Sequence, residues 1–304
     1  MDNEDDVRFQ EVGGLKLAYR LFGHSDGRRV ALVTGFGDQM TEWPQSLIDG
    51  LVTAGCYVLV YEPRDSGLSD SFANGTVYDV PTIMGAAMGS GVRADYDLDD
   101  LANELIGLTD QLGFSGAHLI GYSMGGMIIQ RAALRAPSFA SLTLVFTSSG
   151  APHLSQGSPE SAMASLALTQ PQAETERVTA GMRLIEITNG KTLGKSEAEA
   201  RHEIEASQKR AYRPDGVGRM MMALLSSAPA FDRLSEIKMP VLVLSAEQDC
   251  FFGPDHAQDL IERITHAQLM EIAGSGHNLP EPVGAEILRL WSAHQNKSSG
   301  NVNA

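Results

Sequence analysis

The stretch that decides the fold is residues 117–135, which read AHLIGYSMGGMIIQRAALR. Its first part, Ala117–Tyr122, is a short apolar run typical of a buried strand, and Met124–Arg135 has the periodicity of a helix. Between them Gly121–Gly125 has the pattern G-x-S-x-G. A serine at so sharp a strand-to-helix turn is pushed above the strand ends, where its hydroxyl is exposed. The sequence therefore predicts a nucleophile at Ser123.

Working outward from this turn, short apolar runs alternate with helical stretches, which is typical of a mostly parallel sheet covered by helices on both faces. Runs without polar alternation suit strands that are buried on both sides. We predict strands in a hairpin at 11–22 and at Val30–Val33, Cys56–Tyr61, Leu142–Phe146, Val241–Ser245 and Gln268–Ile272. We predict further helices at Leu98–Leu112, Asp255–Ile264 and Pro282–His294. The predicted class is α/β.

Residues 151–236 differ from the rest because they have helical periodicity and contain no convincing strand. We interpret them as a helical cap inserted before the penultimate strand. The predicted division is a first core segment at 1–150, the cap at 151–236 and a second core segment at 237–304. A stretch near 72–95 is rich in Gly and Met and receives no assignment.

Composition narrows the classes of partner and compartment. The 304 residues include 23 Lys and Arg against 38 Asp and Glu, a net charge of −15. This charge repels phosphate backbones and anionic lipid surfaces, so we expect neither nucleic acid nor a membrane as partner. The start MDNEDDVRF has no basic or apolar leader, and no run of 18 apolar residues occurs. We expect a cytoplasmic protein; its oligomeric state stays open.

Two cysteines, Cys56 and Cys250, exclude a disulfide scaffold. They could still meet in space, but reduced thiols are the simpler interpretation in a reducing compartment. The role of Cys250, directly after an acidic residue, stays open.

A serine hydroxyl needs a base, and the base needs an acid to orient it. Of eight histidines, His277 alone lies in a marked local pattern, the loop Gly274–Pro280 just past the last predicted strand. We predict His277 as the base. Asp249 directly follows the strand VLVLSAEQ and is our choice for the acid, with Glu247 and Asp255 as close alternatives. The resulting chain order is Ser, Asp, His.

Acyl transfer to serine also needs two preplaced N–H donors for the tetrahedral oxyanion. The first predicted donor is the backbone N–H of Met124, at the start of the helix behind Ser123. The second is the N–H of Phe36, in the loop after Thr34-Gly35, and Gly37 gives that loop freedom to curl inward. The alternative is that Gly35-Phe36-Gly37 is an ordinary turn at the end of a strand.

These residues together resemble the α/β-hydrolases, and in particular the subgroup typified by aclacinomycin methylesterase. The matching stretches cover most of the two core segments and become sparse in the cap; they are Thr34–Gly37, Trp43-Pro44, Tyr61–Ser69, Gly121–Met127, Asp249 and Gly276–Pro280. The resemblance implies a serine triad under a helical cap, with no metal or cofactor. It also implies that Arg64 and Asp65 connect neighbouring loops rather than bind substrate.

Two positions depart from the pattern of the wider fold. Many relatives have His-Gly where this chain has Thr34-Gly35, so a hydrogen bond that stiffens the oxyanion loop is either missing or replaced. A proline commonly follows the acid by four residues, whereas Pro254 follows Asp249 by five. The second departure leaves the choice of acid less secure than that of the nucleophile and base.

Taken together, these features predict a hydrolase that cleaves a carboxylic ester of a small to medium hydrophobic substrate, such as a methyl ester of a natural product. The same triad can open a lactone, cleave a C–C bond beside a carbonyl or form a peracid. A ligand-binding protein with a vestigial triad is a further alternative. Haloalkane dehalogenases and epoxide hydrolases are disfavoured because they need a carboxylate at position 123.

Methionines concentrate in the parts of the sequence that are hardest to interpret. Flexible thioethers could line an adaptable apolar pocket or fill a core, and both roles stay open. The residues concerned are Met84, Met88, Met163, Met182, Met220, Met221 and Met222.

Overall fold

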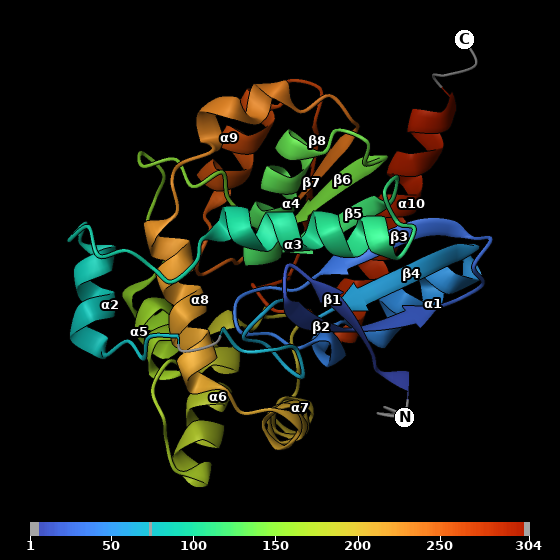
Figure 1. The fold of residues 1–304 in the computed structure, drawn as a ribbon. Coiled ribbons are helices and arrows are strands. Elements are labelled where there is room, and N and C mark those ends of the chain that lie inside the picture. The colour runs from blue at the N-terminus through green and yellow to red at the C-terminus, as the bar shows by residue number, and fades with distance from the viewer. Residues whose placement is uncertain (1–5, 73–74, 301–304) are drawn as a thin grey trace.

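A single eight-stranded sheet forms the centre of the protein in a computed structural model that describes residues 6–72 and 75–300 (Figure 1). The strand order is β1-β2-β4-β3-β5-β6-β7-β8. The first two strands are antiparallel to their neighbours, and β3 to β8 run parallel. The bounds are β1 Arg8–Val12, β2 Leu15–Phe22, β3 Arg28–Val33, β4 Cys56–Tyr61, β5 His118–Tyr122, β6 Ser141–Val145, β7 Val241–Ala246 and β8 Gln268–Ile272.

Helices cover both faces of this sheet, as the unalternating strands predict. On one face α1 (Gln45–Thr53) and α10 (Glu281–Gly300) pack over a core that includes Leu47, Ile287 and Trp291. On the other face a larger apolar cluster joins the sheet to three helices. These are α3 (Leu98–Gln111), α4 (Met124–Arg135) and α9 (Pro254–Arg263). The predicted α/β class and mostly parallel sheet are confirmed.

The strands and helices predicted from the sequence agree with those observed to within a few residues at most boundaries. Helix α3 begins where expected because the Asp97 side chain accepts hydrogen bonds from the first-turn amides, and Asp100 completes the capping box. The main omission lies in the unassigned stretch near 72–95. It contains a short helix, α2 (Val80–Ala87), capped by Asp79.

Four helices lie between β6 and β7 and form a layer beside the sheet (Figure 1). They are α5 (Pro159–Ala167), α6 (Glu174–Thr188), α7 (Glu197–Arg210) and α8 (Pro214–Ser226), followed by a 3-10 turn, η3 (Phe231–Glu236). We call α5 to α8 the cap helices. Helix α2 packs with α5 and α8 around Ile83, Leu166 and Met222, so this layer also recruits part of the first segment. The three-part division at 150 and 236 stays a prediction.

Two buried ion pairs connect the cap helices to the loop that follows β4. Arg210 at the end of α7 pairs with Glu62, and Arg219 on α8 pairs with Asp65. The Asp65 carboxylate also accepts a hydrogen bond from Tyr96, and Arg64 pairs with Glu104 of α3. Residues 64 and 65 therefore connect neighbouring elements, as the sequence led us to expect. No helix in the described ranges is long and apolar enough to cross a bilayer.

Candidate active site

Ser123 lies at a sharp turn between β5 and α4, with the left-handed dihedrals φ 53° and ψ −119°. This strained conformation is fixed from outside, since the Ser123 N–H donates to the Val145 carbonyl at 2.9 Å and Thr147 Oγ1 donates to the Ser123 carbonyl at 2.6 Å. The flanking glycines are required by close approach. A Cβ on Gly121 would lie 2.5 Å from the Gly125 carbonyl oxygen, and one on Gly125 would lie 2.1 Å from that of Val33.

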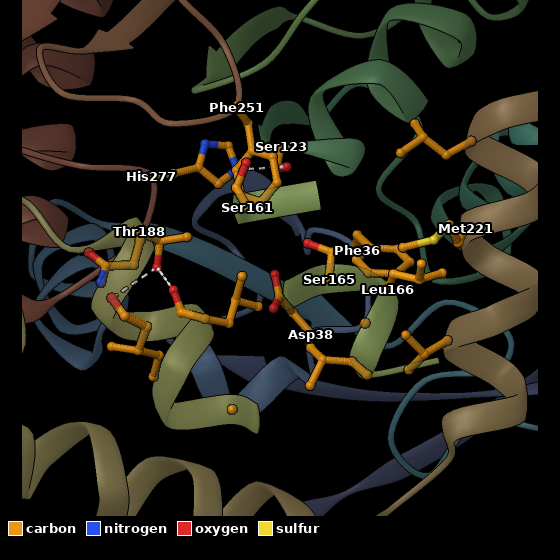
Figure 2. A pocket seen from close by; sticks show the side chains of 18 of the residues that line it. Phe36, Asp38, Ser123, Ser161, Ser165, Leu166, Thr188, Met221, Phe251 and His277 are labelled. Carbon is orange, nitrogen blue, oxygen red and sulfur yellow. Dashed lines mark hydrogen bonds between the residues drawn. The ribbon is translucent and has the colours of Figure 1, made fainter. Parts of the chain in front are cut away.

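The three residues predicted as nucleophile, base and acid come together at the carboxyl ends of the parallel strands. His277 Nε2 lies 3.0 Å from Ser123 Oγ, and His277 Nδ1 lies 2.8 Å from Asp249 Oδ2. Figure 2 shows the imidazole beside the serine hydroxyl at one end of a pocket. The Asp249 side chain is 2% exposed and its other oxygen, Oδ1, accepts the amides of Phe251 and Phe252 at 2.8 and 2.9 Å. These amides fix the carboxylate, and the carboxylate orients the imidazole.

The two alternative acids are engaged elsewhere. Glu247 accepts a hydrogen bond from the backbone N–H of Gly274 at 2.6 Å. Asp255 accepts the N–H and Oγ of Ser155 at 2.6 and 2.7 Å. The geometry therefore favours Asp249, although Pro254 follows it by five residues. The spacing is one residue longer than usual, and the segment between Asp249 and Pro254 contains the turn whose two amides bind the Asp249 carboxylate.

Aromatic rings surround the His277 imidazole. The rings of Phe251, Phe252 and Tyr122 lie with centroids 4.7, 5.4 and 5.4 Å from it, and Tyr122 OH donates to the His277 carbonyl. These contacts leave His277 only 4% exposed, so most solvent is excluded from its imidazole. They also hold the ring in one orientation. Of these rings, only the Phe251-Phe252 pair, which begins two residues after Asp249, could have been noticed in the sequence.

The two predicted oxyanion donors lie at the same edge of the sheet. Met124 is the first residue of α4, so its N–H has no acceptor within the helix. Phe36 lies in the loop after β3 and, like Ser123, lines the pocket. In the described part of the chain, neither amide donates to another protein group. The loop turns back at Gly37, where φ is 74°.

A cavity of about 710 Å³ separates this site from the cap helices. Ser123 and His277 form part of its lining, and α5, α6, α7 and α8 contribute most of the opposite wall. The methionines divide between the two roles left open by the sequence. Met84, Met88, Met163 and Met221 line the cavity, whereas Met220 and Met222 are fully buried in the packing of the fold.

One side of the cavity is polar. Asp38 and Glu42, on the segment that follows β3, line it together with Lys195 and Glu203, which form an ion pair with each other. Burial raises the pKa of Asp38. The pKa of Glu42 is raised well above its usual value by burial and by the nearby charges of Asp38 and Glu203. Asp38 and Glu42 were not among the predicted site residues, and their position just after Gly35-Phe36-Gly37 is the signal that could have pointed to them.

The two cysteines lie at opposite edges of the sheet. Cys56 begins β4, at the amino ends of the parallel strands, and Cys250 follows β7 at their carboxyl ends. Both thiols are free. Burial and the charge of Asp249 raise the pKa of Cys250 to about 12, so this thiol stays protonated at neutral pH. In the described ranges no cluster of His, Cys, Asp and Glu is arranged to hold a metal ion.

Comparison with known proteins gives relatives over most of the chain. A rhodomycin D methylesterase of Streptomyces peucetius is 27% identical, and the match covers 84% of this chain and 88% of that one. A 2-hydroxy-6-oxononadienedioate/2-hydroxy-6-oxononatrienedioate hydrolase of Klebsiella pneumoniae is also 27% identical, over 89% of this chain and 88% of its own. Both relatives are hydrolases, but their names differ in the substrate.

A solved structure agrees with this fold. The enol-lactonase of Burkholderia xenovorans LB400 superposes with a TM-score of 0.69 at 20% identity, covering 96% of this chain and 98% of that one. At this identity the likeness concerns the fold alone. The family model described as "alpha/beta hydrolase fold" matches residues 29–281, which include β3 to β8, the cap helices and the Ser123 site. The chain belongs to the α/β-hydrolase fold family.

Proposed function

We propose that the protein is a serine-dependent carboxylic ester hydrolase that forms an acyl-enzyme on Ser123. The observation that carries this proposal is the hydrogen-bonded series from Ser123 Oγ through His277 to Asp249, at 3.0 and 2.8 Å, at one end of the cavity. A serine, an imidazole and a buried carboxylate in this order form the arrangement used for nucleophilic acyl transfer. The methylesterase relative supports an ester as the substrate.

In this mechanism His277 Nε2 accepts the proton of Ser123 as its Oγ attacks the ester carbonyl carbon. The Asp249 carboxylate keeps the Nδ1 proton of His277 in place and stabilises the imidazolium that forms. The carbonyl oxygen gains negative charge and accepts hydrogen bonds from the N–H groups of Met124 and Phe36. Collapse of this intermediate expels the alcohol, which takes the proton from His277.

Water then releases the acid. It gives a proton to His277 and attacks the acyl carbon; when the second tetrahedral intermediate collapses, its bond to Ser123 Oγ breaks, His277 returns the proton to that oxygen, and the acid is released. Each step uses groups of this chain and water alone. The rings of Phe251, Phe252 and Tyr122 keep the imidazole oriented through both half-reactions.

The cavity supports a small to medium hydrophobic substrate. Its volume of about 710 Å³ lies within the usual range for small-molecule sites. Thioethers of Met84, Met88, Met163 and Met221 give its walls an adaptable apolar surface. By analogy with the methylesterase relative, a methyl ester of a natural product is the substrate class that we propose to test first.

The direct test is hydrolysis of p-nitrophenyl acetate and butyrate by the wild type and by Ser123→Ala. We expect Ser123→Ala to lower kcat/KM by several orders of magnitude, about 10⁴ or more, as loss of a triad nucleophile does elsewhere. Ser165→Ala is the matched control because Ser165 also lines the cavity but lies away from His277 (Figure 2). We expect less than a tenfold loss from this control.

Two other outcomes of these experiments would contradict the proposed function. A loss of tenfold or less in Ser123→Ala would place the nucleophile at another residue. A wild type that neither hydrolyses these esters nor reacts with a small fluorophosphonate would be a binding protein. For a wild type that hydrolyses these esters or is labelled, methyl esters, lactones and vinylogous diketones are compared by product analysis, to separate ester hydrolysis from lactone opening and C–C cleavage.

A further inference from the structure

The loop that carries Phe36 is not held by a side-chain hydrogen bond from Thr34, the residue that follows β3. Thr34 occupies the position where many relatives have a histidine, and its side chain is nearly fully buried. Within the described ranges, Thr34 Oγ1 has no hydrogen-bond partner. Thr34 therefore fills space but does not hold the loop through its hydroxyl.

Asp38 supplies a hydrogen bond to this loop instead. Its Oδ2 accepts the N–H of Gly35 at 3.1 Å, which fixes the Thr34-Gly35 peptide, one peptide before the one that carries the Phe36 N–H. The fit is tight, because a Cβ on Gly35 would lie 2.5 Å from Asp38 Oδ2 and 3.0 Å from the Tyr122 ring. The backbone of Asp38 is itself fixed, since Ser66 Oγ donates to the Asp38 carbonyl. The loop after β4 thus fixes the backbone of Asp38, and the Asp38 side chain in turn fixes the loop after β3.

Asp38 also interacts with a second carboxyl group. Glu42 lies four residues further along the same segment, close enough to Asp38 for the two buried carboxyl groups to influence each other's pKa. Burial and the nearby charges of Asp38 and Glu203 raise the pKa of Glu42 well above its usual value, which favours the uncharged form of Glu42. Glu42 Oε1 in turn accepts from Ser207 Oγ of α7 at 2.7 Å.

We propose that Asp38 is a positioning residue for the oxyanion site: by accepting the Gly35 N–H it fixes the turn that presents the Phe36 N–H, and Glu42 lies next to Asp38 on the cap side. This inference rests on the proposed function. The series of neighbouring groups runs from Ser207 on the cap through Glu42 and Asp38 to the Thr34-Gly35 peptide, directly before the Phe36 N–H. An oxyanion donor stabilises the transition state only when its N–H points at the developing negative charge. Loss of the hydrogen bond that positions the loop should therefore lower the rate of acyl transfer.

Other charged groups also face Asp38. Lys195 and Glu203 come from the cap, His277 from the loop before α10, and Tyr122 from the end of β5. Positive charge on Lys195 and on His277 favours ionised Asp38, while Glu203 opposes it. The imidazolium that forms during acyl transfer therefore also favours Asp38 as the acceptor of the Gly35 N–H.

The test compares Asp38→Ala with Asp38→Asn, using p-nitrophenyl butyrate hydrolysis and the rate at which a fluorophosphonate labels Ser123. We expect Asp38→Ala to lower kcat by about ten- to a hundredfold with KM changed by less than about threefold, because oxyanion donors act mainly in the transition state. The labelling rate should fall in parallel. Asp38→Asn keeps an oxygen acceptor for Gly35 and should retain kcat to within about fivefold.

A second variant gives a pH profile that a merely structural role would not produce. As pH rises through the raised pKa of Glu42, its carboxyl group ionises beside Asp38, and the two like charges separate. We expect kcat of the wild type to fall at pH values above the pKa of Glu42. Glu42→Gln has no such proton and keeps an N–H donor toward Asp38, so its profile should lack this fall.

Each outcome decides the proposal. It is overturned if Asp38→Ala keeps kcat to within twofold of the wild type, if Asp38→Asn is as impaired as Asp38→Ala, or if Glu42→Gln retains the fall of the wild type. Thermal unfolding shows whether each variant is folded, and if Asp38→Ala is not, the other two variants decide. Failure of the proposed function is separate, because the wild type itself would then neither hydrolyse the ester nor be labelled.

Discussion

Helix α4 of the core and helices α6 and α7 of the cap are similar in length but differ in burial. In α4, 9 of 12 residues are buried, including glycines at positions 125 and 126 that have no room for a side chain. In α6 only 2 of 15 residues are buried, and in α7 only 2 of 14. Helix α4, behind Ser123, is therefore packed on most sides, whereas α6 and α7 bury only a narrow face.

If the protein acts as proposed, we expect the core residues to carry out acyl transfer and the cap residues to select the substrate. The core holds Ser123, His277 and Asp249 with short hydrogen bonds and fully packed neighbours. The cap provides adaptable side chains on a layer with much of its surface in solvent. Substitutions in the core should then abolish activity or folding, while substitutions on the cavity side of the cap should change which ester is preferred.

After Ser123→Ala, the largest effect on activity is expected from Asp249→Asn. An amide at this position cannot stabilise the imidazolium and favours the wrong His277 tautomer, so kcat should fall by about 10³- to 10⁴-fold. Kinetics with p-nitrophenyl butyrate measure it. The matched controls are Glu247→Gln and Asp255→Asn, whose carboxylates bind Gly274 and Ser155 instead. A larger loss in either control than in Asp249→Asn would reassign the acid.

A smaller but still large effect is expected on stability from Gly125→Ala. The new Cβ would lie 2.1 Å from the Val33 carbonyl oxygen and 2.5 Å from that of Thr34, both on the backbone. The free energy of unfolding should fall by more than about 3 kcal/mol, or the protein should fail to fold. Denaturant unfolding followed by circular dichroism gives this value.

The matched cap substitution is Gly218→Ala in α8. Its Cβ would meet only Thr169 atoms at 3.7 Å, an ordinary contact, and alanine is the better helix former by about 1 kcal/mol. We expect this variant to be within about 1 kcal/mol of the wild type. Equal losses in the two glycine variants would remove the contrast between core and cap.

The smallest effect is expected from Met221→Ala, which enlarges the cavity from the cap side (Figure 2). The kcat/KM ratio of butyrate to acetate esters should change by about three- to tenfold, because a methylene in an apolar pocket contributes about 1–3 kcal/mol. The neighbouring Met222 is fully buried, so Met222→Ala should instead lower stability by about 2–5 kcal/mol. A change in stability without a change in the ester ratio for Met221→Ala would contradict its place in the pocket.

The same contrast explains what could be predicted from the sequence. In the core, strands buried on both faces read as continuous apolar runs, and the glycines around Ser123 mark close backbone approach, so the sheet and the turn at Ser123 were predicted before the structure. His277 and Asp249 were predicted because each directly follows a strand at the same edge of a parallel sheet. The geometry brings these three residues together.

The cap and the polar side of the cavity were harder to predict. Helix α2 was not recognised, because its apolar residues pack against α5 and α8, which are distant in sequence. The role of Asp38 depends on its hydrogen bond to Gly35 and on Glu42 and Ser207, which meet only after the cap folds over the site. Which methionines line the cavity likewise depends on the packing of helices and not on local periodicity.

The central claim is that Ser123 is the acyl-transfer nucleophile, and it is tested most directly by mapping the residue that a fluorophosphonate modifies. Wild type and Ser123→Ala are treated side by side, and peptides are identified by mass spectrometry. We predict one adduct, on the peptide that contains Ser123, in the wild type and none in Ser123→Ala. An adduct on another residue, or ester hydrolysis by a wild type that gives no adduct, would contradict this account.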